Sequence, residues 1–160
     1  MKKVIVIGCP GSGKSTLSLR LHERTGIPLY HLDMMYWNAD KTTVSKEVFL
    51  SRLEEVLCTE SWIIDSNYSS TLEMRISACD TVIFLDYPLE VCLSGILERR
   101  GKPRGDMPWV ETEEDQEFMD FIRSFNESQR PVILELFGSH ADKNIIIFKS
   151  RAEASRYFET

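Results

Sequence analysis

The segment Gly8–Ser15 limits the folds open to this chain more than any other part of its sequence. It reads Gly-Cys-Pro-Gly-Ser-Gly-Lys-Ser, matches the pattern G-x-x-x-x-G-K-[ST], and is followed by Thr16. The apolar run Val4–Ile7 stands before it, and Lys14–Thr25, with leucines at helical spacing, stands after it. A strand before and a helix after are the context that this pattern requires, so a phosphate-binding loop is favoured over a chance glycine-rich turn.

Each residue type in this loop has a physical task. Gly11 and Gly13 can adopt positive φ, so that successive backbone N–H groups curl round a phosphate. The helix expected to begin near Lys14 directs the positive end of its dipole at that phosphate. Lys14 is expected to reach the β- and γ-phosphates, and the Ser15 hydroxyl to ligate Mg²⁺. The loop therefore predicts binding of ATP, or another nucleoside triphosphate, with Mg²⁺, by Gly8, Cys9, Pro10, Gly11, Ser12, Gly13, Lys14, Ser15 and Thr16.

Short apolar runs bounded by turn residues alternate with stretches of helical spacing along the chain. This alternation predicts an α/β protein with a parallel sheet covered on both faces. A length of 160 residues indicates a single domain that spans residues 1–160. Ser150 and Glu153 have the spacing of a capping box and predict a last helix. Strands are expected at Val4–Ile7, Leu29–Leu32, Trp62–Ile64, Thr81–Leu85 and Asn144–Phe148, and earlier helices at Lys14–Thr25, about 43–58 and about 89–100.

Charge and composition restrict the partners. The net charge of −6 argues against broad electrostatic binding to nucleic acid or to an anionic membrane surface. The apolar run after Lys2 and Lys3 is too short for a signal peptide or a membrane span. The four cysteines lack the spacing of metal or redox motifs. We therefore expect a cytoplasmic protein with reduced thiols.

The segment from Arg99 to Arg130 interrupts the alternation of strands and helices. It begins as a basic loop rich in glycine and proline and continues as an acidic run over residues 111–117. Cations that meet the charge developing on a transferred phosphoryl group accelerate such reactions, so Arg99 and Arg130 are predicted to be catalytic. The alternative is a solvated basic loop whose arginines pair with the acidic run. We expect this role for at least two of Arg99, Arg100, Arg104, Arg123 and Arg130.

Several segments together resemble the adenylate-kinase-like P-loop proteins of the DNA topology modulation group, relatives of nucleoside monophosphate kinases and shikimate kinase. The resemblance implies the three-layer P-loop NTPase fold, with five parallel strands in the order 2-3-1-4-5. It also implies an acceptor-binding insertion at about residues 34–60 and a lid at about 99–130. The segments that carry the resemblance are Val6–Thr16, Tyr30–Asp33 with Trp37, Trp62–Asp65 with Asn67 and Tyr68, Asp80–Pro88, and Arg130–Leu136.

Three predicted strands end in an aspartate: Asp33, Asp65 and Asp86. The carboxyl ends of the strands form the ligand crevice of an open α/β sheet. In the order 2-3-1-4-5, Asp65 lies beside the phosphate loop and is predicted to hold a water bound to Mg²⁺. Asp33 resembles the position that contacts substrate or Mg²⁺ in shikimate kinase-like proteins, and is predicted to bind the acceptor and assist its deprotonation. Asp86 is interpreted as a turn residue; a turn or cap role is the alternative for the other two.

The acceptor site is predicted around the ends of the second and third strands. Trp37 and Tyr68 are candidates for its wall or for the core, and Asn67 for a hydrogen bond to the acceptor. Arg75 is a candidate partner for an anionic acceptor. Monophosphate kinases of the adenylate type usually carry an arginine soon after the third-strand aspartate, and the residues after Asp65 offer none. This departure weakens AMP as the acceptor.

These features favour an ATP-dependent kinase that phosphorylates a small molecule: a nucleotide, a nucleoside or a hydroxylated metabolite. Two alternatives stay open. One is a nucleotide-dependent regulatory module that binds another macromolecule, although no basic helix or zinc finger is present to read DNA. The other is a plain NTPase without an acceptor.

Overall fold

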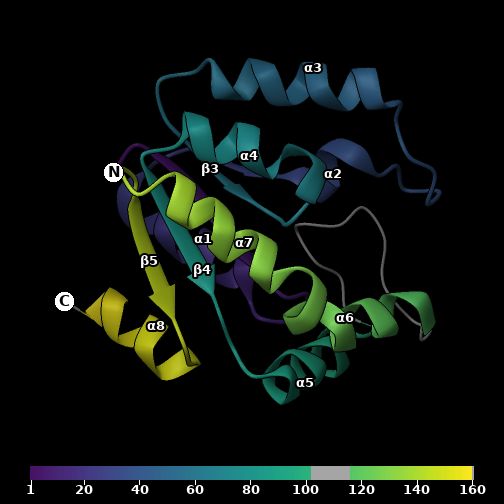
Figure 1. Cartoon of the computed structure of the whole chain (residues 1–160). Coiled ribbons are helices and arrows are strands. Elements are labelled where there is room, and N and C mark those ends of the chain that lie inside the picture. The colour runs from purple at the N-terminus through teal and green to yellow at the C-terminus, as the bar shows by residue number, and fades with distance from the viewer. Residues whose placement is uncertain (102–115, 160) are drawn as a thin grey trace.

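The computed structural model describes residues 1–101 and 116–159. Its centre is one parallel sheet of five strands in the order β2-β3-β1-β4-β5 (Figure 1). The sheet class and the strand order predicted from the sequence are confirmed. The strands are β1 (Lys3–Gly8), β2 (Leu29–His31), β3 (Trp62–Asp65), β4 (Thr81–Leu85) and β5 (Asn144–Phe148).

Helices cover both faces of the sheet and its carboxyl end. In Figure 1, α4 and α7 lie in front of the sheet and α1 lies behind it, while α5 and α6 pack together below the strand ends. The helices are α1 (Lys14–Thr25), α2 (Leu32–Tyr36), α3 (Lys46–Leu57), α4 (Ser69–Ala78), α5 (Leu89–Arg99), α6 (Gln116–Ser128), α7 (Arg130–Ser139) and α8 (Arg151–Glu159). Among the described residues, no helix is both long enough and apolar enough to span a membrane.

The three central strands form the core. All side chains of β3 and β4 are buried, as are those of Val4–Ile7 in β1. Strands buried on both faces need continuous apolar sequence rather than alternation, which explains the Val- and Ile-rich runs. The outer strands β2 and β5 are more exposed.

The first helix has the bounds that the sequence predicts. Its N-cap Gly13 has φ 99° and its C-cap Gly26 has φ 75°. Glycine adopts these left-handed conformations at low cost, and the Gly26 N–H reaches the His22 carbonyl to close the last turn at 2.8 Å. The two glycines therefore place the helix start directly at the phosphate loop.

Two of the boundaries that differ from the prediction have a clear local cause. The second strand ends at His31, because Leu32 already begins α2. The helix expected from about residue 43 begins at Lys46, because the Ser45 side chain caps it by accepting from the Val48 N–H at 3.2 Å. Residues 37–43 form a separate turn, closed by a bridge between Trp37 and Thr43.

The capping box predicted at the last helix is half confirmed. The Glu153 N–H donates to the Ser150 hydroxyl at 3.2 Å, as a capping box requires. The Glu153 carboxylate instead accepts from the N–H of Lys149, one residue earlier, at 2.7 Å. This hydrogen bond still fixes the exit of the chain from β5 into α8.

Candidate nucleotide and acceptor site

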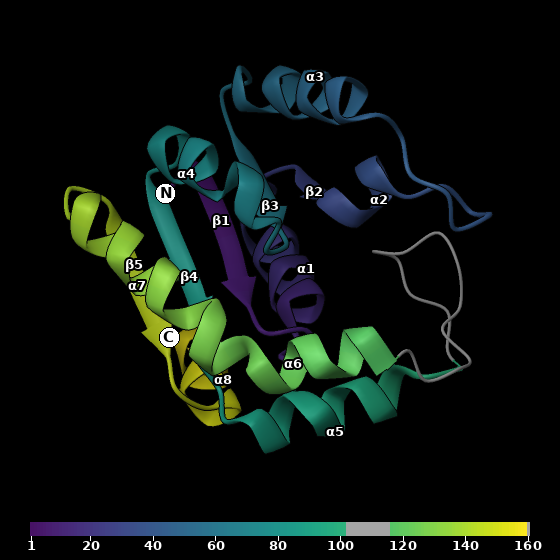
Figure 2. The same cartoon turned by 45° about the vertical axis from the view of Figure 1, so that its right-hand side comes forward.

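A cleft of about 1540 Å³ lies at the carboxyl ends of the strands. Its floor is the phosphate loop, its upper side in Figure 2 is formed by α2 and the loop after β3, and α5 and α6 lie along its lower side. Pockets for one drug-sized ligand usually have about 300–1,000 Å³, so this cleft has room for two bound molecules.

The phosphate loop has the geometry that the motif predicts. Gly11 and Gly13 have φ of 85° and 99°. The Lys14 ammonium donates to the Gly8 carbonyl at 3.1 Å, which holds it over the loop. The Ser12 hydroxyl is buried and has no hydrogen-bond partner among the described residues. A buried hydroxyl without a partner carries a desolvation cost that a phosphate oxygen would relieve.

The predicted charged residues meet at Lys14. Burial lowers the pKa of the Lys14 ammonium, while Asp65 and Asp33 raise it and Arg99 lowers it further. These three side chains also line the cleft. The structure thus brings the donor lysine, both predicted carboxylates and one predicted lid arginine to one place.

Close packing of α5 against the phosphate loop depends on two glycines. A Cβ on Gly95 would lie 2.0 Å from the Gly11 carbonyl oxygen, and a Cβ on Gly11 would lie 2.0 Å from the Cys92 carbonyl oxygen. Both distances are well inside van der Waals contact, so the backbones touch only because neither residue has a side chain. This contact was not predicted from the sequence.

Gly95→Ala is therefore expected to destabilise the protein by about 1–3 kcal/mol and to weaken nucleotide binding, since α5 or the loop must move. Gly138→Ala in α7 is the matched control, because a Cβ there meets nothing within 4 Å. It should stabilise by up to about 1 kcal/mol through helix propensity. Urea unfolding of both variants measures the contrast, and equal stability of Gly95→Ala and wild type would refute the contact.

Asn67 holds the phosphate loop in place. Its side-chain amide donates to the Gly8 carbonyl at 2.5 Å, and its side-chain oxygen accepts from the Gly8 N–H at 3.1 Å. Asn67 was predicted to bind the acceptor, and it does line the cleft. Both ends of its amide join the loop after β3 to the end of β1.

Arg75 lies in the interior and not in the cleft. It is fully buried and donates to the carbonyls of Ser66, Asn67 and Tyr68 at 2.9, 2.7 and 3.1 Å. Burial lowers the pKa of its guanidinium to about 10. The predicted contact between Arg75 and an anionic acceptor is wrong, because the guanidinium donates its hydrogen bonds to the backbone of the loop after β3.

The loop clamped by Arg75 has an unusual backbone. Ser66 has φ 134°, a conformation that residues with a side chain rarely adopt. Such a conformation costs on the order of 1–3 kcal/mol and persists where its surroundings impose it. The hydrogen bonds from Arg75 supply that constraint, and they set the positions of Asn67 and Tyr68.

Tyr68 joins Asp33 and Trp37. The Tyr68 hydroxyl donates to the Asp33 carboxylate at 2.5 Å. Burial raises the pKa of Tyr68, as does the neighbouring Asp33 charge, while a side-chain hydrogen bond with Trp37 opposes this effect. All three residues line the cleft, as predicted for an acceptor pocket.

Asp65 pairs with His31 at the ends of β3 and β2. The two residues are register partners, and the His31 Nδ1 lies 2.6 Å from the Asp65 carboxylate. Asp65 is only 4% exposed, yet both residues line the cleft. Asp65 was predicted as a site residue and His31 was not; the parallel pairing of β2 with β3 brings the two together.

The donor set at Ser15 and Asp65 is compatible with Mg²⁺. Mg²⁺ keeps several waters and takes one or two protein oxygens together with substrate phosphates. One hydroxyl and one carboxylate on the same cleft meet that demand. The described ranges 1–101 and 116–159 contain no group of three or more His, Cys, Asp or Glu side chains arranged to hold a metal ion.

The two arginines predicted to be catalytic are placed differently. Arg99 lines the cleft and lies 5.8 Å from the Phe118 ring centroid. Arg130 does not line the cleft; it donates to both carboxylate oxygens of Asp86 at 2.9 and 3.0 Å. The prediction for Arg130 is wrong, because its guanidinium pairs with Asp86, directly after the carboxyl end of β4. Arg104 lies outside the described residues, as does much of the expected lid.

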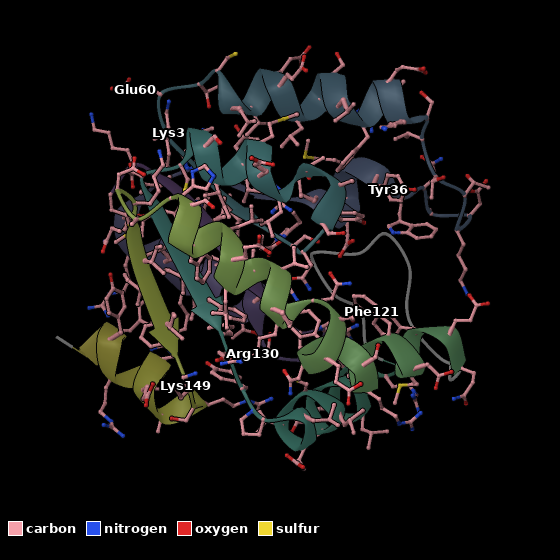
Figure 3. The ribbon with its side chains drawn as sticks, viewed as in Figure 1. Lys3, Tyr36, Glu60, Phe121, Arg130 and Lys149 are labelled. Atoms are coloured by element: carbon pink, nitrogen blue, oxygen red, sulfur yellow. The ribbon has the colours of Figure 1, made fainter. Side chains whose placement is uncertain are left out.

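Asp86 is more than a turn residue. Its carboxylate also accepts from Lys149 at 2.5 Å, and Figure 3 shows Arg130 and Lys149 close together near the ends of β4 and β5. Burial by itself would raise the pKa of Asp86, but the hydrogen bonds from Arg130 and Lys149 outweigh it and lower that pKa. The cluster ties α7 to the edge of the sheet.

The lowered pKa of Asp86 predicts an acid-dependent loss of stability. Its contribution is complete above the unfolded-state pKa, about 3.9, and is lost as the pH falls through the lower folded-state value. Asp86→Asn should cost about 1–2 kcal/mol at neutral pH and progressively less below about pH 4. Asp120→Asn, in an exposed pair with Arg123, is the control and should change little. Urea unfolding across pH measures both; a pH-independent effect of Asp86→Asn would contradict this account.

Sequence reasoning missed the donor-side wall of the cleft. Arg20 of α1 and Arg151 of α8 line it, and the Arg20 guanidinium lies 4.7 Å from the Phe158 ring centroid. Phe118 and Phe121 of α6 line it as well. The apolar spacing in α6 was the available signal, but the acidic run before it suggested an irregular segment.

Comparison with known proteins shows the fold. Shikimate kinase from Acinetobacter baumannii, in complex with shikimate, aligns with 99% of this chain and 89% of its own, at 14% identity and a TM-score of 0.67. Shikimate kinase from Bacteroides thetaiotaomicron aligns over 98% of this chain and 93% of its own, at 20% identity and a TM-score of 0.61. Shikimate kinase from Aquifex aeolicus aligns over 98% of this chain and 90% of its own, at 17% identity and a TM-score of 0.58. No family model and no curated protein sequence matches the chain.

The chain thus has the P-loop fold that these shikimate kinases have, over nearly its whole length. The five strands in the order β2-β3-β1-β4-β5 and the helices on both faces are common to that fold. At identities of 14–20% the likeness concerns the fold and leaves the substrate to be argued from the residues of the cleft.

Proposed function

We propose that this protein is an ATP-dependent kinase that transfers the γ-phosphoryl group to a hydroxyl of a small molecule. One observation carries the proposal: Lys14 on the phosphate loop and Asp33 on α2 border the same two-ligand cleft and interact electrostatically. A lysine for phosphates and a carboxylate for a hydroxyl are the donor and acceptor ends of such a reaction. The shared fold with shikimate kinases is consistent with this chemistry.

In the proposed reaction the acceptor hydroxyl oxygen attacks the γ-phosphorus, and the bond from that phosphorus to the β,γ-bridging oxygen breaks. Asp33 takes the proton of the hydroxyl, and ADP leaves. Lys14 and the loop N–H groups stabilise the charge on the phosphate oxygens, and Arg99 adds a second cation from α5. Mg²⁺, held through Ser15 and a water on Asp65, would neutralise phosphate charge when bound.

Tyr68 orients the proposed base. Its hydroxyl donates to one oxygen of the Asp33 carboxylate and so fixes the position of that carboxylate in the cleft. We propose further that the segment of about residues 34–60 binds the acceptor and that about 99–130 acts as a lid. Within the P-loop kinase-like superfamily we propose the topology modulation group, on the strength of Tyr30–Asp33 with Asn67 and Tyr68.

An ATP-consumption screen tests the proposal. Purified protein with ATP and Mg²⁺ is offered nucleosides, nucleotides and small polyols, with ADP and inorganic phosphate both followed. Acceptor-dependent ADP formation without inorganic phosphate is expected. Hydrolysis without an acceptor would indicate a plain NTPase, and tight ATP binding without any turnover would favour the regulatory module.

A further inference from the structure

The acceptor side of the cleft is backed by an aromatic cluster. Tyr36 is its centre, with ring centroids 5.5 Å from Trp37, 5.2 Å from Phe49 and 5.3 Å from Tyr68, all edge-on. Phe49 and Tyr68 lie 5.4 Å apart. Trp37 and Tyr68 line the cleft, while Tyr36 and Phe49 pack behind them. The rings therefore hold one another in fixed orientations.

A tight turn fixes Trp37 from its other side. The bridge between Trp37 and Thr43 closes residues 37–43, and the Asn38 N–H donates to the Thr42 carbonyl at 2.8 Å. Lys41, which also lines the cleft, sits in this turn with φ 68°. The Asp40 carboxylate accepts from the Thr42 N–H at 3.0 Å and stabilises the turn. Such strain in a turn at a cleft is typical of a preorganised ligand contact.

The polar groups of this wall are engaged with one another. Trp37 hydrogen-bonds the Tyr68 side chain, and the Tyr68 hydroxyl donates to Asp33. The surface that Trp37 offers to a ligand is therefore its aromatic ring, which lies beside the Asp33 carboxylate. Arg75 faces the interior and Arg52 donates to the Met35 carbonyl, so neither of these two described arginines offers a grip on an acceptor phosphate.

We propose that the acceptor carries a planar aromatic or heteroaromatic ring that stacks on Trp37, and a hydroxyl that reaches Asp33. The inference rests on the proposed kinase function and names its substrate class. Nucleosides are compounds of this kind. Non-aromatic polyols, including shikimate, lack the flat aromatic face that this wall fits.

The test measures phosphate transfer from ATP to three sets of acceptors. The first set carries aromatic rings and hydroxyls (adenosine, cytidine, uridine and pyridoxine), the second carries hydroxyls without an aromatic ring (shikimate, glucose and glycerol), and the third holds the nucleoside monophosphates AMP, CMP and UMP. Transfer to a member of the first set, with a KM well below that of any non-aromatic compound, is expected. Transfer only to non-aromatic acceptors, or only to nucleoside monophosphates, would overturn the inference while leaving a kinase. Transfer to no acceptor at all, with ATP bound, would instead overturn the proposed function.

Variants of Trp37 give the second arm. Trp37→Ala should raise the acceptor KM about 10-fold, as loss of one stacking contact does, with the ATP KM unchanged. Trp37→Phe should keep most of the affinity. Val132→Ala, exposed in α7 and outside the cleft, is the control and should change neither KM. If Trp37→Ala does not fold, Trp37→Leu retains bulk without a ring. An unchanged acceptor KM in folded Trp37→Ala or Trp37→Leu would refute stacking.

Discussion

Lys14→Ala is expected to lower kcat for phosphoryl transfer by at least about 10²–10³-fold, since it removes the cation closest to the phosphate loop. The Lys14 ammonium is held by the Gly8 carbonyl and lies among Asp65, Asp33 and Arg99. The affinity for ATP should also fall. Initial rates of ADP formation with saturating acceptor measure the effect on kcat, and calorimetric titration measures binding.

Two controls separate chemistry from folding. Lys2→Ala removes an exposed lysine before β1, outside the cleft, and should leave kcat unchanged. The free energy of unfolding of Lys14→Ala should stay near the wild-type value, because burial already lowers the pKa of this lysine and disfavours its charge. Wild-type kcat in Lys14→Ala would exclude the loop as the donor site.

Arg75→Met is expected to destabilise the protein by about 3–5 kcal/mol, the largest stability effect that we predict. The substitution removes the guanidinium that donates to the carbonyls of Ser66 and Asn67, and one of the donors to the Tyr68 carbonyl, which also accepts from Thr71. The strained Ser66 also loses its constraint. Urea unfolding measures the change, and Arg75→Lys should recover only part of it, because an ammonium cannot reproduce the planar fork.

The same substitution should impair catalysis from a distance. The loop held by Arg75 carries Asn67, which binds Gly8, and Tyr68, which binds Asp33. Both the donor and the acceptor side should therefore loosen, with a higher KM for ATP and for the acceptor in whatever folded fraction remains. Stability within about 1 kcal/mol of wild type would show that Arg75 is not the clamp described above.

The parts predicted well are those that depend on local sequence. The phosphate loop, α1 and the buried strands β1, β3 and β4 are each determined by a contiguous pattern of glycines or apolar residues. The strand order came from resemblance rather than from any pattern, and the sheet confirms it. Asp33, Trp37 and Tyr68 line the cleft because strand ends and their flanking segments meet there, and Arg99 lines it from the end of α5.

The polar side chains whose roles were predicted poorly serve as structural partners, in two cases over long sequence separations. Arg75 was assigned to an anionic acceptor, and Arg130 to the charge that develops on a transferred phosphoryl group. The structure pairs Arg75 with backbone carbonyls and Arg130 with Asp86, 44 residues away in sequence. The joining of Asn67 to Gly8 spans 59 residues. No local pattern distinguishes such structural uses of a polar side chain from functional ones.

Transfer of label from ATP carrying radioactive phosphorus at the γ-position tests the central claim most directly. The wild-type protein is incubated with labelled ATP, Mg²⁺ and an acceptor that carries an aromatic ring and a hydroxyl. The acceptor and inorganic phosphate are then separated, and the label in each is measured. We predict that the label appears in the acceptor and that Lys14→Ala abolishes this transfer. Label found only in inorganic phosphate, or retained entirely in ATP across the whole acceptor panel, would contradict the assignment as a kinase.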